Sequence, residues 1–291
     1  MLLDRLVTRG NADGSWGYRS GLPGCAEPTA LACLSLAAHG IATDRLSAGL
    51  DWLRKMQRPD GSVPVSTTIS TPGWATGLAV SAWMAGRGKQ VDAPHQCVAK
   101  AVDWLLAMRG IKLRETDQLG HNTQLQGWPW VSNTHSWVEP TAYALLALRA
   151  ANNTNHPRFR EGIALLMDRV LPGGGWNYGN TQVLGQTLRP FPATTGVALA
   201  ALAGQPEFRA IEKSLAYLTE ALATARSPLS TAWGVIGLKA WKRQSHEAER
   251  LLNRAAEWAS DDEPNALHDA LLLLAAADVC PLTTQGARDH A

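Results

Sequence analysis

The feature that most constrains this chain is a helix-start pattern that recurs along it. The pattern EPTAxAxLxL begins at Glu27 and again at Glu139. A proline near the first helical position, with a polar residue before it and an alanine and leucine run after it, indicates the start of a helix. Both runs are apolar on nearly every face, so each helix has to be buried on most of its sides. The chain therefore needs a fold in which several helices lie fully inside.

A looser form of the pattern is a small polar residue followed by alanine or glycine and then a small or apolar run. It occurs at Thr29, Thr76, Thr141, Thr195, Thr231 and Asn265. Spacings of about 35–65 residues are typical of repeats built from helix pairs. Between the apolar helices the sequence predicts a short first helix over 2–8 and amphipathic helices over 45–57, 94–108, 158–169, 208–224 and 245–259.

Two concentric rings of helices explain this alternation, because inner helices are covered on both sides and outer helices expose one face to solvent. We therefore predict an all-α fold, an (α/α)6 toroid of six helix pairs with apolar helices inside and amphipathic helices outside. The alternative is an open superhelical solenoid, since six repeats do not require closure. The repeats predict a single domain over residues 1–282, and the polar residues 283–291 are predicted to form a disordered tail.

Charge and cysteine usage exclude several function classes. The formal net charge is +2 with no basic stripe, so no nucleic-acid partner is expected. The four cysteines are scattered without a CxxC pair, and we expect neither a disulfide framework, nor a metal, nor a cofactor. The sequence has no run of about 18 apolar residues that could span a bilayer. It also has no signal-peptide pattern at its start, so a cytoplasmic location is expected, with peripheral membrane contact left open.

Tryptophan is unusually frequent, with 12 copies against 3 phenylalanines and 4 tyrosines. Core filling alone would not favour it, because tryptophan is rarely buried completely. Tryptophans near the starts of the apolar helices could line a cavity and face a cation, while structural stacking is the alternative. We predict as substrate-binding residues Trp74, Trp83, Trp128, Trp130, Trp137 and Trp233, together with Glu27 and His268.

Three glycine-containing turns carry a resemblance to a known family. The turns at 13–16, 57–61 and 173–176 resemble the QW repeats (Q-x-x-x-G-x-W) of squalene–hopene cyclases and related triterpene cyclases. Each copy departs from the pattern: Val63 stands where the repeat of Gln57 would have its tryptophan, and Trp16 and Trp176 lack their glutamine. The superfamily includes the β-subunits of protein prenyltransferases, and the resemblance implies an α/α toroid that handles isoprenoids.

The segment Trp137-Val-Glu-Pro-Thr-Ala142 resembles the D-x-D-D-T-A motif that opens an inner helix in those cyclases. The resemblance implies that Glu139 is the proton donor, although Trp137 and Pro140 replace the two supporting aspartates, which makes Glu139 a weaker acid. His135 would lie one turn away and could tune Glu139, so we predict these two as catalytic residues. His268 resembles the zinc-binding histidine of the prenyltransferases, but the Asp-x-Cys ligands are missing, and we predict no metal.

Three functions remain open. The first is acid-initiated cyclisation of an apolar polyprenyl substrate in a tryptophan-lined cavity. The second is binding of a prenyl chain, lipid or partner segment without chemistry. The third is a carbohydrate-active toroid that uses Glu27 and Glu139 as acid and base. A wet groove lined by several Asp and Arg residues would favour the third. The two glutamates could also serve only to stabilise helix N-termini, each by about 0.3–1 kcal/mol.

Overall fold

The computed structural model describes residues 2–41, 43–71, 73–87, 95–114, 119–206, 208–243, 247–261 and 265–284. Of the predicted tail, Thr283 and Thr284 lie in a turn, with the Thr283 amide donating to the Cys280 carbonyl at 3.0 Å. The rest of the predicted tail, 285–291, lies outside the described residues. No described helix combines the length and the hydropathy needed to span a bilayer.

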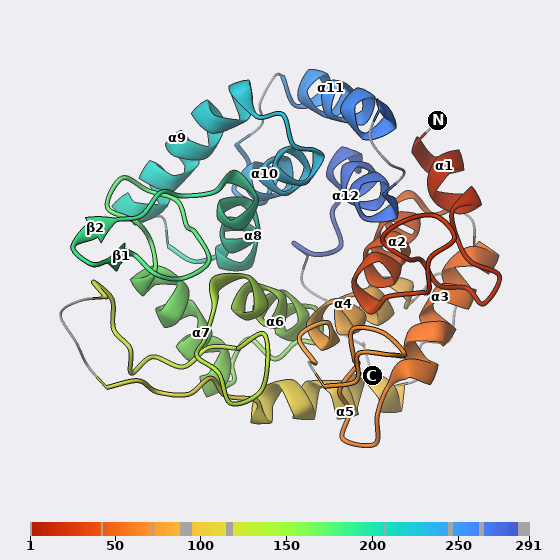
Figure 1. The fold of residues 1–291 in the computed structure, drawn as a ribbon, viewed down its shortest axis with the longest axis horizontal. Helices are drawn as coiled ribbons and strands as arrows, with labels where there is room; N and C mark the ends of the chain where they lie inside the picture. The colour runs from red at the N-terminus through yellow and green to blue at the C-terminus, as the bar shows by residue number, and fades with distance from the viewer. Residues whose placement is uncertain are drawn as a thin grey trace.

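Twelve helices in the described part of the chain form two concentric rings (Figure 1). The inner ring consists of α2 (Ala26–His39), α4 (Thr76–Gly86), α6 (Val138–Ala150), α8 (Pro192–Leu202), α10 (Pro228–Ala240) and α12 (Ala266–Ala276). The outer ring consists of α1 (Leu2–Thr8), α3 (Thr43–Met56), α5 (His95–Ala107), α7 (Pro157–Asp168), α9 (Arg209–Thr224) and α11 (Ala248–Asp261). Each inner helix packs on the next, and α12 packs on α2, so the ring is closed. The predicted toroid is confirmed, and the open solenoid is excluded.

The two kinds of helix lie where their hydrophobic patterns require. Inner helix α8 is buried along nearly its whole length, whereas outer helix α9 buries one stripe that includes Ile211, Leu218 and Leu222. Helix α6 begins slightly earlier than predicted: Pro140 is its third residue and not its first. Proline fits there because the first four amide groups of a helix have no intrahelical acceptor.

A buried threonine in the first turn joins four of the inner helices to the loop before them. Its hydroxyl accepts a hydrogen bond from a backbone amide in that loop, whereas the hydroxyl of Thr231 in the fifth repeat has no partner among the described residues. The pairs are Trp16 to Thr29 at 2.9 Å, Val63 to Thr76 at 2.8 Å, Trp128 to Thr141 at 3.0 Å and Trp176 to Thr195 at 2.9 Å. The three indole N–H groups donate to carbonyls of the preceding outer helices, at Leu6, Leu105 and Leu166. The turn tryptophans therefore join a loop, an inner helix and an outer helix.

The sixth repeat uses a different residue at the threonine position. Asp269 lies four residues after the N-cap Asn265, as Thr29 lies four after Cys25, so Asp269 and not Asn265 is the equivalent residue. Asp269 is fully buried and forms ion pairs with Arg9 and, at 2.7 Å, with Arg5. These contacts hold the short helix α1 against α12, where the first and last repeats meet.

One end of the ring is filled by the chain itself. The segment that follows α12, coloured blue in Figure 1, runs across the interior of the ring. Within it, Leu282 is fully buried and Cys280 nearly so. Lys239 on α10 donates to the carbonyls of Ala275 and Ala277, at 2.7 and 3.1 Å, and fixes the start of this segment. Residues 277–284 are therefore packed into the ring beside the C-terminal ends of α10 and α12.

One feature of the fold was not predicted. Strands β1 (Gln182–Val183) and β2 (Gln186–Thr187) form an antiparallel hairpin in the loop before α8. Leu184 and Gly185 form its two-residue turn, both with positive φ, at 50° and 76°. Strands of two residues are too short to produce an alternating hydrophobic pattern, so the sequence did not reveal them.

Adjacent glycines in one turn allow a matched test of the repeat geometry. Gly174 has φ +96°, and a Cβ there would lie 2.5 Å from the Lys213 carbonyl carbon on α9. Gly173 has open space around it and no positive φ. We expect Gly174→Ala to lower the free energy of unfolding by about 2–4 kcal/mol, because strain and overlap add. Urea unfolding should show almost no change for Gly173→Ala, and equal effects of the two variants would contradict this geometry.

Candidate functional site

The N-terminal ends of the inner helices surround a cavity of about 240 Å³ at the centre of the ring. Its lining is mostly apolar and aromatic, with two carboxyl groups. The lining residues are Glu27, Trp74, Trp130, Glu139, Tyr143, Ala193, Val197, Leu229, Trp233 and Leu267. These residues lie at or just before the N-terminal ends of the inner helices, except for Trp130 from a loop, whereas residues 277–284 follow the C-terminal end of α12.

The cavity is built from one register of the repeat. The residue two positions before the buried threonine, or before Asp269, lines the cavity in all six repeats. These residues are Glu27, Trp74, Glu139, Ala193, Leu229 and Leu267. The residue two positions after the threonine adds Tyr143, Val197 and Trp233. Trp74 lies in the turn just before α4 and Trp130 in the loop before α6, so two positions of the repeat supply every lining residue named above except Trp130.

Each carboxyl group accepts one hydrogen bond from a hydroxyl group. The Tyr18 hydroxyl donates to Glu27 at 2.5 Å, and the Thr194 hydroxyl donates to Glu139 at 2.8 Å. The pKa of Glu27 is raised to about 7, mainly by burial. The hydrogen bond from Tyr18 acts in the opposite direction, and the charge of Glu139 adds to the rise. Burial also raises the pKa of Glu139, against the bond from Thr194. Glu27 can therefore carry a proton at neutral pH.

Aromatic rings form a continuous wall beside these acids. Trp74 meets Trp130 edge to face at 4.9 Å between ring centroids, and it stacks on Tyr143 at 6.1 Å. Tyr143 in turn lies 5.9 Å from Trp233. Burial raises the pKa of Tyr143, as do the charges of Glu27 and Glu139, so its phenol stays protonated. Aromatic faces stabilise an adjacent positive charge, by about 2 kcal/mol or more when it is desolvated.

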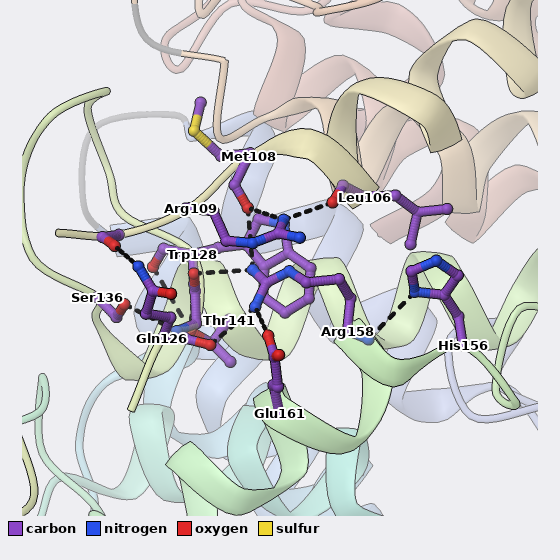
Figure 2. Close-up of polar contacts among 12 residues, drawn as sticks. Leu106, Met108, Arg109, Gln126, Trp128, Ser136, Thr141, His156, Arg158 and Glu161 are labelled. Carbon is purple, nitrogen blue, oxygen red and sulfur yellow. Dashed lines mark hydrogen bonds and ion pairs between the residues drawn. The ribbon is translucent and has the colours of Figure 1, made fainter. Parts of the chain in front are cut away.

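Five of the predicted site residues line this cavity: Glu27, Trp74, Trp130, Glu139 and Trp233. The other five lie elsewhere, and the structure gives each of the three tryptophans among them a packing contact. The Trp83 indole donates to the Leu50 carbonyl at 3.2 Å, and the Trp128 ring lies under the Arg158 guanidinium at 4.2 Å (Figure 2). The Trp137 ring lies against the His135 ring, with the centroids 4.4 Å apart and the planes tilted by 44°.

Two predicted roles for histidine find no support in these contacts. His135 lines a second cavity, described below, and its ring lies against Trp137. No described hydrogen bond joins it to Glu139, so it cannot tune that acid by direct contact. His268 lies in the first turn of α12 and does not line the central cavity, which Leu267 borders instead. Among the described residues, no group of three or more His, Cys, Asp or Glu side chains gathers as a metal site would.

Sequence reasoning missed Tyr18, Tyr143 and Thr194. Tyr143 could have been found, because it lies one turn after Glu139 on the same helix face. Tyr18 and Thr194 had no such signal, since they reach the carboxyl groups from a loop and from a neighbouring inner helix. Their roles depend on how separate repeats pack.

The raised pKa of Glu27 predicts a pH-dependent stability. The pKa is about 7 in the folded protein and 4.5 in the ordinary case, so the folded state binds this proton more tightly. The stabilisation is therefore complete below about pH 4.5 and is lost as the pH rises through 7. Between pH 5 and 8 we expect the free energy of unfolding to fall by about 2 kcal/mol relative to Glu27→Gln. Urea unfolding at each pH measures this difference. In the control Glu220→Gln, which changes an exposed residue, the free energy of unfolding should differ from that of wild type by the same amount across this pH range.

Comparison with known proteins places the chain near the terpenoid cyclases. No protein-family model matches it. The squalene–hopene cyclase of Bradyrhizobium diazoefficiens is 28% identical over 155 residues, a match that covers 50% of this chain and 22% of that enzyme. The chain thus spans well under two thirds of this relative.

Solved structures share the fold over nearly the full length. The type II terpene cyclase MstE from Scytonema, in complex with geranylgeranyl dihydroxybenzoate, superposes with a TM-score of 0.63 and 14% identity, covering 97% of this chain and 96% of that one. A novel α-amylase from Clostridium perfringens superposes with a TM-score of 0.69 and 10% identity, covering 94% and 96%. At such identities these likenesses show the fold alone.

Proposed function

We propose that this chain, a terpenoid cyclase-like α/α toroid, cyclises a small isoprenoid by protonating it in the central cavity. The observation that carries the proposal is the union, in one mostly apolar cavity, of two carboxyl groups with raised pKa values and a wall of aromatic rings. The acids can start and end a cationic reaction, and the rings can stabilise the cation between those steps. The partial match to a squalene–hopene cyclase supports the same class of chemistry.

The volume of the cavity supports a short substrate. A dry protein cavity of about 150 Å³ holds one benzene molecule. On that scale the cavity of about 240 Å³ accommodates about ten non-hydrogen atoms. An isoprenoid of about ten carbons therefore fits, whereas a thirty-carbon chain would extend far beyond the cavity.

The acidity of the site favours a substrate with a basic oxygen. A carboxylic acid with a pKa of about 7 is matched to proton transfer to an oxygen atom near neutral pH. Direct protonation of an unactivated C=C bond needs a stronger acid, and Trp137 and Pro140 replace the aspartates that would provide one. A short isoprenoid epoxide fits the cavity and carries a basic oxygen. Protonating that oxygen opens the epoxide ring and generates the carbocation.

The proposed reaction is an isomerisation. The carboxyl proton of Glu27 moves to the epoxide oxygen as the C–O bond breaks, which leaves a carbocation on carbon. A C=C bond of the same molecule supplies the electron pair for the new ring bond, and the positive charge moves along the chain. The last cation loses a proton to the Glu139 carboxylate and forms a C=C bond. One proton has then passed from Glu27 to Glu139, and its return restores the site.

The cavity gives less support to the alternatives. A carbohydrate-active site was expected to have several Asp and Arg residues in a wet groove, and the described lining contains neither residue type. Binding of an isoprenoid without chemistry would use the same apolar wall, but it gives no role to two buried acids. The α-amylase likeness concerns the fold alone.

The test is to incubate the purified protein with isoprenoid epoxides of ten, fifteen and thirty carbons and to analyse extracts by gas chromatography and mass spectrometry. We expect cyclic alcohols of unchanged mass from the ten-carbon epoxide and least product from the longest. Native mass spectrometry on the same samples detects bound ligand. Binding without product would support a binding module, and neither binding nor product would reject an isoprenoid site.

A further inference from the structure

A second cavity, of about 170 Å³, lies outside the inner ring, between the end of α7 and the long loop before α6. Its polar lining residues include His121, His135, Arg169 and Asn180, and its apolar lining residues include Ile111 and Leu113. The central cavity carries two carboxyl groups, whereas this one is lined by a cation and two imidazole rings, so it suits a different ligand.

Arg169 is a buried cation whose hydrogen-bonding capacity is only partly used. Its side chain is 5% exposed, and its Nη1 group donates to the Asn122 carbonyl at 3.2 Å and to Asp168. Within the described ranges, its Nε and Nη2 groups have no acceptor. A guanidinium presents its N–H groups in a planar fork that matches two oxygens of an oxyanion. Arg169 lines the cavity, so an oxyanion there could accept hydrogen bonds from these free N–H groups and pair with the charge of a mostly buried side chain.

The two histidines add further donors. The Nδ1 atom of His121 is buried and has no hydrogen-bond partner in the part of the chain that the structure describes. Burial lowers the pKa of both His121 and His135, and the charge of Arg169 lowers both further. For His121 the charge of Asp168 acts in the opposite direction. Three cationic or potentially cationic groups therefore face one small space, and an anion there would stabilise all of them.

We propose that this second cavity binds a small tetrahedral oxyanion of the phosphate class, held by the free edge of Arg169 and by ring N–H groups of His121 and His135. A tetrahedral anion accepts hydrogen bonds on several faces, and the donors come from separate segments of the chain. A volume of about 170 Å³ is close to the benzene scale of about 150 Å³, and it accommodates phosphate or sulfate with room to spare. The site is independent of the chemistry proposed for the central cavity.

The first test uses sulfate, whose charge is constant between pH 5 and 8. Histidine ring signals are followed by NMR as the pH is varied, with sulfate or with chloride at equal ionic strength. Sulfate should raise the pKa of both His121 and His135 by about one unit, because a bound anion favours imidazolium. Binding of sulfate should therefore tighten as the pH falls. Equal shifts with sulfate and chloride, or no shift with either, would overturn the proposal.

The second test uses variants and isothermal titration calorimetry with inorganic phosphate. Arg169→Gln should weaken binding by about 10–100-fold, because two charge-assisted hydrogen bonds are lost. Arg160→Gln changes an exposed arginine of the same helix and should leave binding unchanged. If Arg169→Gln does not fold, His121→Gln keeps the arginine and should weaken binding several-fold at pH 6. Unchanged binding in a folded Arg169→Gln, or tighter binding of acetate than of phosphate, would contradict a tetrahedral oxyanion site.

Discussion

Glu27→Gln is expected to reduce cyclisation of a ten-carbon epoxide by about 10²–10⁴-fold, the usual contribution of a general acid. Glutamine keeps the size of the side chain and can still accept the hydrogen bond from Tyr18, but it has no proton to give. In the wild-type protein the rate should fall as the pH rises above 7, because the donor must be protonated and its pKa is about 7. Product formation measured from pH 5 to 9 checks both statements.

Glu139→Gln separates the roles of the two acids. It removes the proposed base, so the rate should again fall, while the loss of activity above pH 7 should remain. The exposed Glu220→Gln should have the activity of wild type. Full activity in Glu27→Gln together with a large loss in Glu139→Gln would instead assign the proton donor to Glu139, as the sequence resemblance implied.

Arg158→Met is expected to lower the free energy of unfolding by about 3–5 kcal/mol, the range for breaking a buried charged contact. Arg158 is 1% exposed, and it donates to the carbonyls of Met108, Gln126 and Gly127 at 2.9–3.1 Å (Figure 2). Methionine fills similar space but removes all three hydrogen bonds. The Gln126 carbonyl then loses the donor that Arg158 supplied, at a cost of about 1–3 kcal/mol when buried, whereas the Met108 and Gly127 carbonyls keep one donor each, from Arg109 and Gly110. Removal of the guanidinium desolvation offsets part of that loss.

Urea unfolding of Arg158→Met and Arg160→Met provides the matched comparison. Both arginines belong to α7, but Arg160 is exposed and donates only to the Asn155 carbonyl. We expect its replacement to change stability by less than about 0.5 kcal/mol, as surface substitutions usually do. A loss below about 1 kcal/mol in Arg158→Met would mean that the long loop before α6 is not held by this arginine.

The helices and their arrangement could be predicted because each depends on local pattern. Apolar and amphipathic stretches differ in composition, and threonine with a small residue after it marks five of the six inner helices. Gly196 shows why the small residue is needed: a Cβ there would lie 2.2 Å from the Trp233 carbonyl oxygen on α10. In the sixth repeat the pattern was placed on Asn265, one turn too early, because Asp269 replaces the threonine there and pairs with arginines on and just after α1.

The site was predicted only in part because proximity to a helix start does not fix the direction of a side chain. Trp74 lies just before α4 and Trp83 lies within it, yet one lines the cavity and the other donates its indole N–H to a carbonyl of α3. The threonine register separates them, since the cavity is lined by positions two residues before and two residues after the threonine. That register becomes visible only when all six repeats are superposed.

The position of residues 277–284 has a consequence for traffic through the protein. This segment crosses the ring beyond the C-terminal end of α12, whereas the central cavity lies at the N-terminal ends of the inner helices. Under the proposed function, substrate would therefore enter and product leave on the N-terminal side. We then expect release of the rigid cyclic product, and not bond formation, to limit the turnover rate.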